Sequence, residues 1–212
     1  MGNRAVISAT RALEPKNSQD LGVYLHWNGG RNSVEAFLKY CKLKGYRSPE
    51  TDNYGYARLC QVIGNFFGGG LSVGVGRCCD LDCDNYDNGT YIIKDWEIVN
   101  RKYQPTYDTD NYDIDEMLKE IDSCQPVREQ LGDFLDAKEV PIEDVKVGDT
   151  VFFFDDIYNK YEKKTVMGFG KESFGWRKTF GVPYVDRYPG MDGDYSDNIN
   201  NYIQGKTVRV CK

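Results

Sequence analysis

The sequence predicts an α+β protein, on the basis of three changes of pattern along its 212 residues. The first hundred residues mix strand-like alternation with helical spacing, and residues 104–139 combine helical spacing with strong acidity. Strand patterns return after Val140. We therefore expect an α+β domain at 1–103, an acidic helical segment at 104–139 and a small β domain at 140–212. A chain of this length can bury a sizeable core without disulfide or metal support.

Two strands are expected near the N-terminus. Residues 5–10 are rich in strand formers, and residues 22–27 alternate so that Val23, Leu25 and Trp27 would share one face. An Asn-Gly-Gly sequence then breaks the second strand.

Two helices are expected next. Asn32 is placed to cap the first helix, with Glu35 three residues later as in a capping box, and helical spacing continues to about Gly45. The second helix covers residues 54–67, and three consecutive glycines at 68–70 end it.

A hairpin completes the predicted N-terminal sheet. Residues 71–76 alternate apolar side chains with small ones, and residues 90–99 read as the returning strand. The Asp-Asn-Gly at 87–89 is a turn signal between them. These elements predict an antiparallel sheet with two helices on one face.

Charge is unevenly distributed along the chain. Residues 104–160 hold 16 acidic and 5 basic side chains, whereas residues 1–103 hold 11 and 13, and residues 161–212 hold 6 and 9. An acidic segment of this kind forms a solvated helical face or a surface that docks on a basic groove. The net charge of −6 argues against general nucleic-acid binding, which depends on neutralising phosphates.

The acidic segment is predicted to be a helical hairpin. Ile114, Met117, Leu118 and Ile121 follow the i, i+3, i+4, i+7 spacing of one helix, and a second helix follows Pro126 with Val127, Leu131, Phe134 and Leu135 facing inward. The C-terminal strand patterns, at 145–154, 164–169 and 207–211, predict a small β-barrel or meander with one long loop at 171–201.

The seven cysteines are predicted to be free thiols, because their number is odd and no secretion signal precedes them. Cys41 and Cys60 lie on apolar helix faces and are expected in the core. Cys79 and Cys83 have a spacing that zinc ligands use, but a second pair is lacking.

The loop that holds these cysteines also alternates acidic residues. Asp80, Asp82 and Asp84 resemble the start of a calcium loop, but Asn85 and Tyr91 occupy the positions where an EF-hand needs Gly and Glu. A cation site between two strands and a solvated acidic loop remain as alternatives.

A ligand pocket is a second hypothesis, at His26, Trp27 and Asn28. His26 is the one histidine of the chain and could act as a general base, although a strand histidine is commonly structural. The glycine-rich stretches do not match a phosphate-binding loop. With no catalytic signature, we expect a non-enzymatic protein without a cofactor.

Basic and aromatic residues alternate in the long C-terminal loop. Such a composition suits weak nucleic-acid contact, a protein-binding surface or a purely structural role. The candidate contact residues are Trp176, Arg177, Lys178, Tyr184 and Arg187.

Three short segments resemble a family of proteins from bacterial phages and mobile elements, most of which have no assigned function. The segments are Met1-Gly2-Asn3-Arg4-Ala5, Tyr24-Leu25-His26-Trp27-Asn28-Gly29-Gly30 and Asn65-Phe66-Phe67-Gly68-Gly69. The resemblance covers roughly the first hundred residues. It implies a role against host defence, including inhibition of CRISPR systems.

We therefore expect a cytoplasmic inhibitor of a bacterial defence protein, such as a CRISPR nuclease, with no membrane contact because no long apolar run is present. Carboxylates would stand in for phosphates in the nucleic-acid channel of the nuclease: Asp108, Asp110, Asp113, Asp115 and Glu116. The alternatives are a protein that sequesters a small nucleotide or metabolite in a pocket bordered by residues 71–76 and Trp27, and a hydrolase centred on His26.

Overall fold

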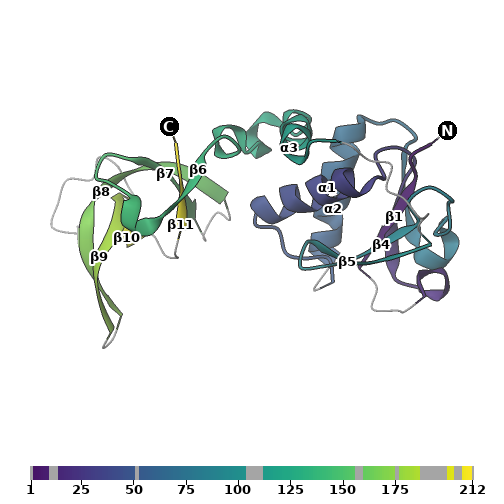
Figure 1. Ribbon diagram of the computed structural model, residues 1–212, viewed down its shortest axis with the longest axis horizontal. Helices are drawn as coiled ribbons and strands as arrows, with labels where there is room; N and C mark the ends of the chain where they lie inside the picture. Colours follow the sequence, from purple (N-terminus) through teal and green to yellow (C-terminus); the bar gives the residue numbers. More distant parts are fainter. Residues whose placement is uncertain are drawn as a thin grey trace. The chain divides into compact units, whose positions relative to one another are not determined.

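The computed structural model describes residues 2–9, 14–50, 53–103, 112–155, 160–174, 177–186, 200–202 and 207–211. The chain divides into two compact units, Met1–Gln130 and Leu131–Lys212 (Figure 1). The boundary between them lies inside the acidic segment, so the carboxylates of that segment are shared between two units.

The first unit contains a five-stranded sheet in its described part. The strands are β1 (Ala5–Ser8), β2 (Leu21–Leu25), β3 (Val73–Arg77), β4 (Thr90–Lys94) and β5 (Glu97–Lys102). Their order is β3-β2-β1-β4-β5, and β1 pairs with β4 in parallel, whereas the other neighbours are antiparallel. The sheet is therefore mixed, and the prediction of an antiparallel sheet was wrong at this central pair.

The predicted hairpin between residues 71–76 and 90–99 does not form. β3 pairs with β2, and β4 pairs with β1 and β5. The segment 90–99 itself reverses direction at Asp95 and Trp96, whose φ angles are +50° and +63°. Two consecutive left-handed residues make the tight turn that suits the twist of a hairpin, although neither of them is glycine.

Two helices follow β2, as predicted. They are α1 (Arg31–Leu43) and α2 (Asn53–Phe67), which lie on the same side of β1 and β4 in Figure 1. The N-cap of α1 is Gly30 instead of Asn32, because helical geometry already begins at Arg31. Gly68 and Gly69 end α2 with φ angles of +63° and +84°, which only glycine adopts readily.

A third helix, α3 (Ile114–Ser123), closes the first unit. Its predicted apolar residues Met117, Leu118 and Ile121 are buried. The buried Tyr40 hydroxyl of α1 donates a hydrogen bond to Asp122 of α3 over 2.7 Å. Burial, reinforced by this bond to a carboxylate, raises the pKa of Tyr40 far above its usual range.

The second helix of the predicted hairpin is absent from the described residues. Two 3-10 turns stand there, η3 (Val127–Glu129) and η4 (Gly132–Phe134), with extended backbone at Gln130. Gly132 has a φ of +53°, which no α-helix allows, and Val127 is 85% exposed instead of facing inward. The remaining 3-10 turns of the described chain are η1 (Pro15–Asn17), η2 (Cys78–Asp80) and η5 (Ile142–Asp144).

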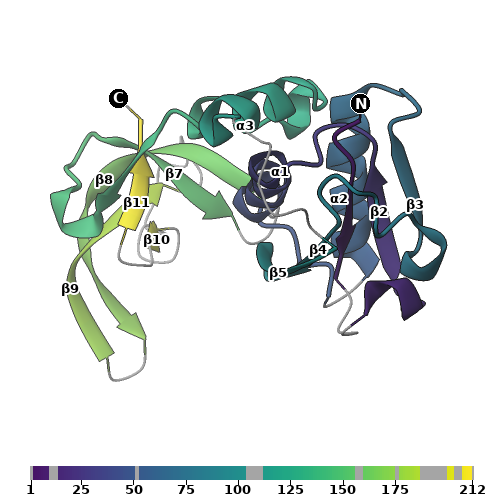
Figure 2. The ribbon, with the colours of Figure 1, turned by 45° about the vertical axis from the view of Figure 1, so that its right-hand side comes forward.

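The second unit is an open antiparallel sheet in its described part. Its strands are β6 (Lys138–Pro141), β7 (Thr150–Asp155), β8 (Lys160–Phe174), β9 (Arg177–Asp186), β10 (Asn200–Tyr202) and β11 (Thr207–Val210). Their order is β10-β9-β8-β7-β11-β6, so β10 and β6 are separate edges and the sheet is not a closed barrel. Strands β7 to β10 form a meander (Figure 2).

Part of the predicted loop at 171–201 belongs to this meander. Strand β8 continues to Phe174 and pairs with β9. Aromatic and β-branched residues in this stretch support strands, and the aspartates and glycines suggested a loop. A small core of Val145, Val151, Val166 and Val208 lies in this unit. In the described part of the whole chain, no helix is long and apolar enough to cross a membrane.

Candidate functional site

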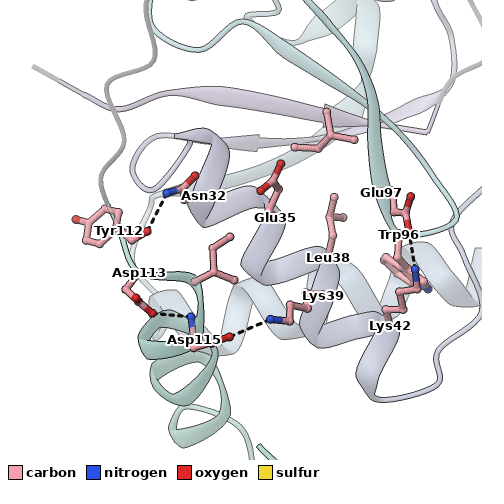
Figure 3. A pocket seen from close by; sticks show the side chains of 12 residues that line it. Asn32, Glu35, Leu38, Lys39, Lys42, Trp96, Glu97, Tyr112, Asp113 and Asp115 are labelled. Atoms are coloured by element: carbon pink, nitrogen blue, oxygen red, sulfur yellow. Dashed lines mark hydrogen bonds and ion pairs between the residues drawn. The ribbon is translucent and has the colours of Figure 1, made fainter. Parts of the chain in front are cut away.

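A groove of about 750 Å³ opens beside α1 in the first unit. It lies between α1, the β4–β5 turn and the start of α3 (Figure 3). Its volume falls within the range of small-ligand sites and peptide subsites. The residues that line it are Asn32, Glu35, Leu38, Lys39, Lys42, Trp96, Glu97, Ile98, Tyr112, Asp113, Ile114 and Asp115.

The floor of the groove is apolar. Leu38 is almost completely buried, as is Trp96, and both Ile98 and Ile114 are partly buried. The indole nitrogen of Trp96 donates a hydrogen bond to the carbonyl of Tyr46 over 2.7 Å, which fixes the ring in its turn. A rigid apolar floor favours a ligand with an apolar part.

Ion pairs occupy the rim. The Lys39 ammonium lies 2.9 Å from Asp115, and the Lys42 ammonium lies 2.7 Å from Glu97. The hydrogen bond from Lys42, together with its positive charge, lowers the pKa of Glu97. Figure 3 shows these two pairs at different sides of the groove, with Leu38 between them. They join α3 and β5 to α1.

Two further contacts hold the rim together. Arg31 donates to Glu35 one turn later in α1 over 2.8 Å, and the side-chain amide of Asn32 donates to the carbonyl of Tyr112 over 2.9 Å. Asn32 therefore anchors the segment before α3, which explains its position at the first turn of α1 better than the predicted capping role.

Asp113 is the N-cap of α3. One of its carboxylate oxygens accepts hydrogen bonds from the backbone amides of Asp115 and Glu116, over 2.8 and 3.0 Å. This cap satisfies amides that the helix itself leaves unpaired, and its charge interacts favourably with the helix dipole. Asp113 therefore has a structural role as a helix cap, whether or not it also contacts a partner.

The lining of the groove carries a negative excess. Its ionisable groups are four carboxylates and two ammonium groups, and the guanidinium of Arg31 beside Glu35 leaves a net excess of one negative charge. An anionic ligand would therefore meet repulsion unless it displaced an existing ion pair, whereas a cation would be attracted.

The five carboxylates that were predicted to bind a partner do not all lie in one described place. Asp113 and Asp115 line the groove, and Glu116 lies beside them on the exposed side of α3. Asp108 and Asp110 lie outside the described residues. Of the three described carboxylates, only Glu116 has neither a capping role nor an ion pair with a described residue.

The predicted pocket at His26, Trp27 and Asn28 does not coincide with the groove. A ring nitrogen of His26 lies 3.2 Å from the Tyr24 hydroxyl, and Trp27 contacts the His26 ring edge-on at 5.1 Å. Trp27 is 44% exposed because β2 ends at Leu25, so it does not continue the buried face of Val23 and Leu25.

The predicted cation ligands face three different partners. Asp80 lies 2.7 Å from Arg77 and Asp84 lies 2.9 Å from Lys16, whereas Asp82 lies 3.5 Å from Arg4. Among the described residues, no three His, Cys, Asp or Glu side chains are grouped closely enough to hold a metal ion. These carboxylates instead attach the loop to neighbouring segments.

Buried Asn85 organises the same loop. Its carbonyl oxygen accepts hydrogen bonds from the backbone amides of Asp87, Asn88 and Gly89, and its amide nitrogen donates to the carbonyls of Asp82 and Gly89. One of the two residues that depart from the EF-hand pattern, Asn85, therefore holds the loop together.

All seven cysteines, which lie within the described ranges, are free thiols, as predicted. Cys41 is buried in the core, and burial raises the pKa of its thiol above the usual range. Cys60 is partly buried. Cys78 and Cys83 pack together with Val6 and are less acidic than an exposed thiol because burial raises their pKa.

The predicted contact residues of the C-terminal half lie partly on β9. Arg177, Lys178 and Tyr184 are in this strand, where they pair with Phe174, Ser173 and Gly168 of β8. Trp176 and Arg187 lie outside the described residues.

Sequence reasoning missed most of the groove. The spacing of Arg31 and Glu35 could have indicated an ion pair on α1. Lys39 is 76 positions from Asp115 and Lys42 is 55 positions from Glu97, so no local sequence pattern could predict these contacts. Comparisons of the chain with protein-family models, curated proteins and solved structures found no match. What the groove binds is therefore inferred from its geometry and charge.

Proposed function

We propose that the protein is a non-enzymatic inhibitor that binds a basic surface of a bacterial defence protein, specifically the nucleic-acid channel of an RNA-guided nuclease of the CRISPR type. The observation that carries the proposal is the exposed acidic face of α3. Glu116 and Glu120 lie one turn apart on this face, and neither forms an ion pair with a described residue. The resemblance of the N-terminal segments to phage proteins supports the choice of target.

The physical basis is electrostatic competition with nucleic acid. A nucleic-acid channel is lined by Lys and Arg, and carboxylates on a rigid helix attract such a surface before contact is made. Because Asp113 caps α3 and Asp115 pairs with Lys39, Glu116 and Glu120 are the carboxylates that are free to meet a partner. Substituting these two leaves the helix cap intact.

The test is charge reversal of this pair. We expect the variant Glu116→Lys/Glu120→Lys to bind its nuclease with an association rate constant lower by about tenfold or more at low salt, because steering is lost. Rising salt should weaken the wild-type complex, because salt screens charges that are farther apart than the Debye length. This length is about 8 Å at physiological ionic strength. Binding to a panel of RNA-guided nucleases is measured by biolayer interferometry, and inhibition by DNA cleavage.

The matched control is Glu143→Lys/Asp144→Lys, which makes the same change of net charge in η5 of the second unit, where both side chains are exposed. It should change the association rate constant by less than about twofold. Equal effects of the two variants, unchanged inhibition by the α3 variant, or the absence of any inhibited nuclease would each contradict the proposal.

A second candidate function is sequestration of a small nucleotide or metabolite. The volume of the groove favours it, at about 750 Å³. The negative excess of the lining opposes an anionic nucleotide. If this function is correct, heat denaturation of protein purified from bacteria should release an intact small molecule that mass spectrometry detects.

A further inference from the structure

The groove beside α1 combines two features that select one kind of occupant. Its floor of Leu38, Trp96 and Ile98 is apolar, whereas its rim carries more carboxylates than ammonium groups. A purely apolar ligand would leave the rim without a partner, and an anion would be repelled by it.

The rim carboxylates retain capacity to accept hydrogen bonds. The bond from Arg31 uses one oxygen of Glu35, the bond from Lys42 uses one oxygen of Glu97, and both capping bonds go to a single oxygen of Asp113. The second oxygen of each makes no hydrogen bond with a described residue. A carboxylate accepts several hydrogen bonds, so an incoming cation can bind without breaking the contacts that hold α3 and β5 to α1.

We propose that this groove is the docking site for a segment of the partner protein in which Arg or Lys lies next to an apolar side chain. The apolar side chain would lie on Leu38 and Trp96, and the cationic group would bind the free oxygens of Glu35 and Glu97. This inference rests on the proposed function, because it names the chemistry of the partner segment that contacts α1 and α3. Arg suits such a site better than Lys, because its planar fork can contact two carboxylates at once.

A synthetic peptide tests the groove without the partner. The probe is a fluorescein-labelled nonapeptide in which two arginines alternate with leucine and phenylalanine, and its matched control has glutamate in place of arginine. By fluorescence anisotropy with the full chain, we expect the basic peptide to bind at least tenfold more tightly than the acidic one. Spermidine alone should not displace it at equal concentration.

Two variants with opposite expected effects distinguish a direct effect on peptide binding from a loss of folding. Glu35→Gln/Glu97→Gln removes two negative charges and should weaken binding of the basic peptide about fivefold. Lys42→Gln makes the groove more negative and should tighten binding about twofold, which a loss of folding cannot do. Glu143→Gln removes one exposed charge in η5 of the second unit, which does not line the groove, and should leave binding unchanged.

Spectral mapping locates the site. In ¹H–¹⁵N spectra, the basic peptide should shift the indole signal of Trp96 and the backbone signals of Leu38 and Ile114, while Trp27 stays unshifted. No binding, equal binding of both peptides, displacement by spermidine, or shifts elsewhere would overturn the proposal.

The two proposals can fail separately. Peptide binding in the groove without inhibition of any nuclease would support the docking site and contradict the proposed target. Inhibition that depends on Glu116 and Glu120 but not on Glu35 and Glu97 would support the target and contradict the docking site.

Discussion

Gly89 lies where the loop before β4 passes close to the end of β5. Its φ is +67°, and a Cβ atom there would lie 2.1 Å from the carbonyl oxygen of Lys102. The carbonyl of Gly89 also accepts the amide of Val6 over 2.9 Å, which aligns the loop with β1. The position therefore requires glycine for two reasons, its backbone conformation and the absence of space.

Alanine substitutions separate these two reasons. Gly69 also has a left-handed φ, of +84°, but nothing lies within 4 Å of its would-be Cβ atom. We expect Gly69→Ala to lower the free energy of unfolding by about 1 to 2 kcal/mol, the cost of the left-handed backbone. Gly89→Ala should cost about 3 kcal/mol or more, because backbone atoms have to move as well.

Urea unfolding followed by circular dichroism measures both variants. If both variants lose the same free energy of unfolding, the close approach of Gly89 to Lys102 adds no destabilisation, which would contradict this expectation.

At the scale of elements, the loop between β3 and β4 is attached to β1 by an ion pair. The side chain of Arg4 lies 2.7 Å from Asp87, and the backbone amide of Arg4 donates to the same carboxylate oxygen over 3.1 Å. The hydrogen bond from the Arg4 side chain is the main cause that lowers the pKa of Asp87. Both side chains are partly shielded from solvent, so salt screens the contact only in part.

This pKa shift predicts a loss of stability in acid. The folded pKa of Asp87 is below its unfolded value of about 3.9, so its contribution is fully present above that pH and is lost as the pH falls through the folded pKa. We expect Asp87→Asn to lower the free energy of unfolding by about 1 to 2 kcal/mol at pH 7. The difference from wild type should shrink below about pH 4.

Chemical denaturation at pH 7, 5, 4 and 3 measures this difference. The control is Glu120→Gln, an exposed carboxylate of the same unit without an ion pair among the described residues, and it should show little pH dependence. A difference for Asp87→Asn that stays constant down to pH 3 would contradict the assignment.

At the scale of the whole molecule, the boundary between the two units divides the acidic segment, so its carboxylates need not form one surface. Among the described residues of 104–160, one group of carboxylates lies on α3 in the first unit and another lies around β6 and η5 in the second. A single acidic docking surface is therefore not implied by the charge count. The proposed function relies on the face of α3 alone for this reason.

The same division predicts that residues 1–130 fold without the second unit. This fragment contains its own sheet, three helices and the groove within its described residues. Two hydrogen bonds near the cut lie inside the fragment: Lys44 donates to the carbonyl of Glu129, and the Gln130 side chain donates to the carbonyl of Gln125. We expect one cooperative thermal transition and binding of the basic peptide within twofold of the full chain.

Differential scanning calorimetry of the fragment and of the full chain measures this. A fragment that unfolds without a cooperative transition would show that the first unit depends on the second.

Local patterns predicted the helices and several strands of this chain. The i, i+3, i+4 spacing in α1, α2 and α3 reflects the pitch of a helix, and the glycines at 68–70 end α2 whatever surrounds it. Strand β1 was likewise expected from its strand-forming residues, and β2 from alternation over a few residues. Each of these features depends on interactions within about one turn or one strand, which is why the amino-acid sequence alone is enough to predict them.

The groove and the mixed sheet depend on contacts that no local pattern encodes. The parallel pairing of β1 with β4, the bond from Asn32 to Tyr112 and the bond from Arg4 to Asp87 join residues about 80 positions apart. Such pairings are decided by which apolar faces meet in the core, and only then do the rim charges come together. The acidity and the local Asp113 cap are thus properties of the sequence, whereas tertiary packing decided which carboxylates pair with a distant lysine, as Asp115 does with Lys39.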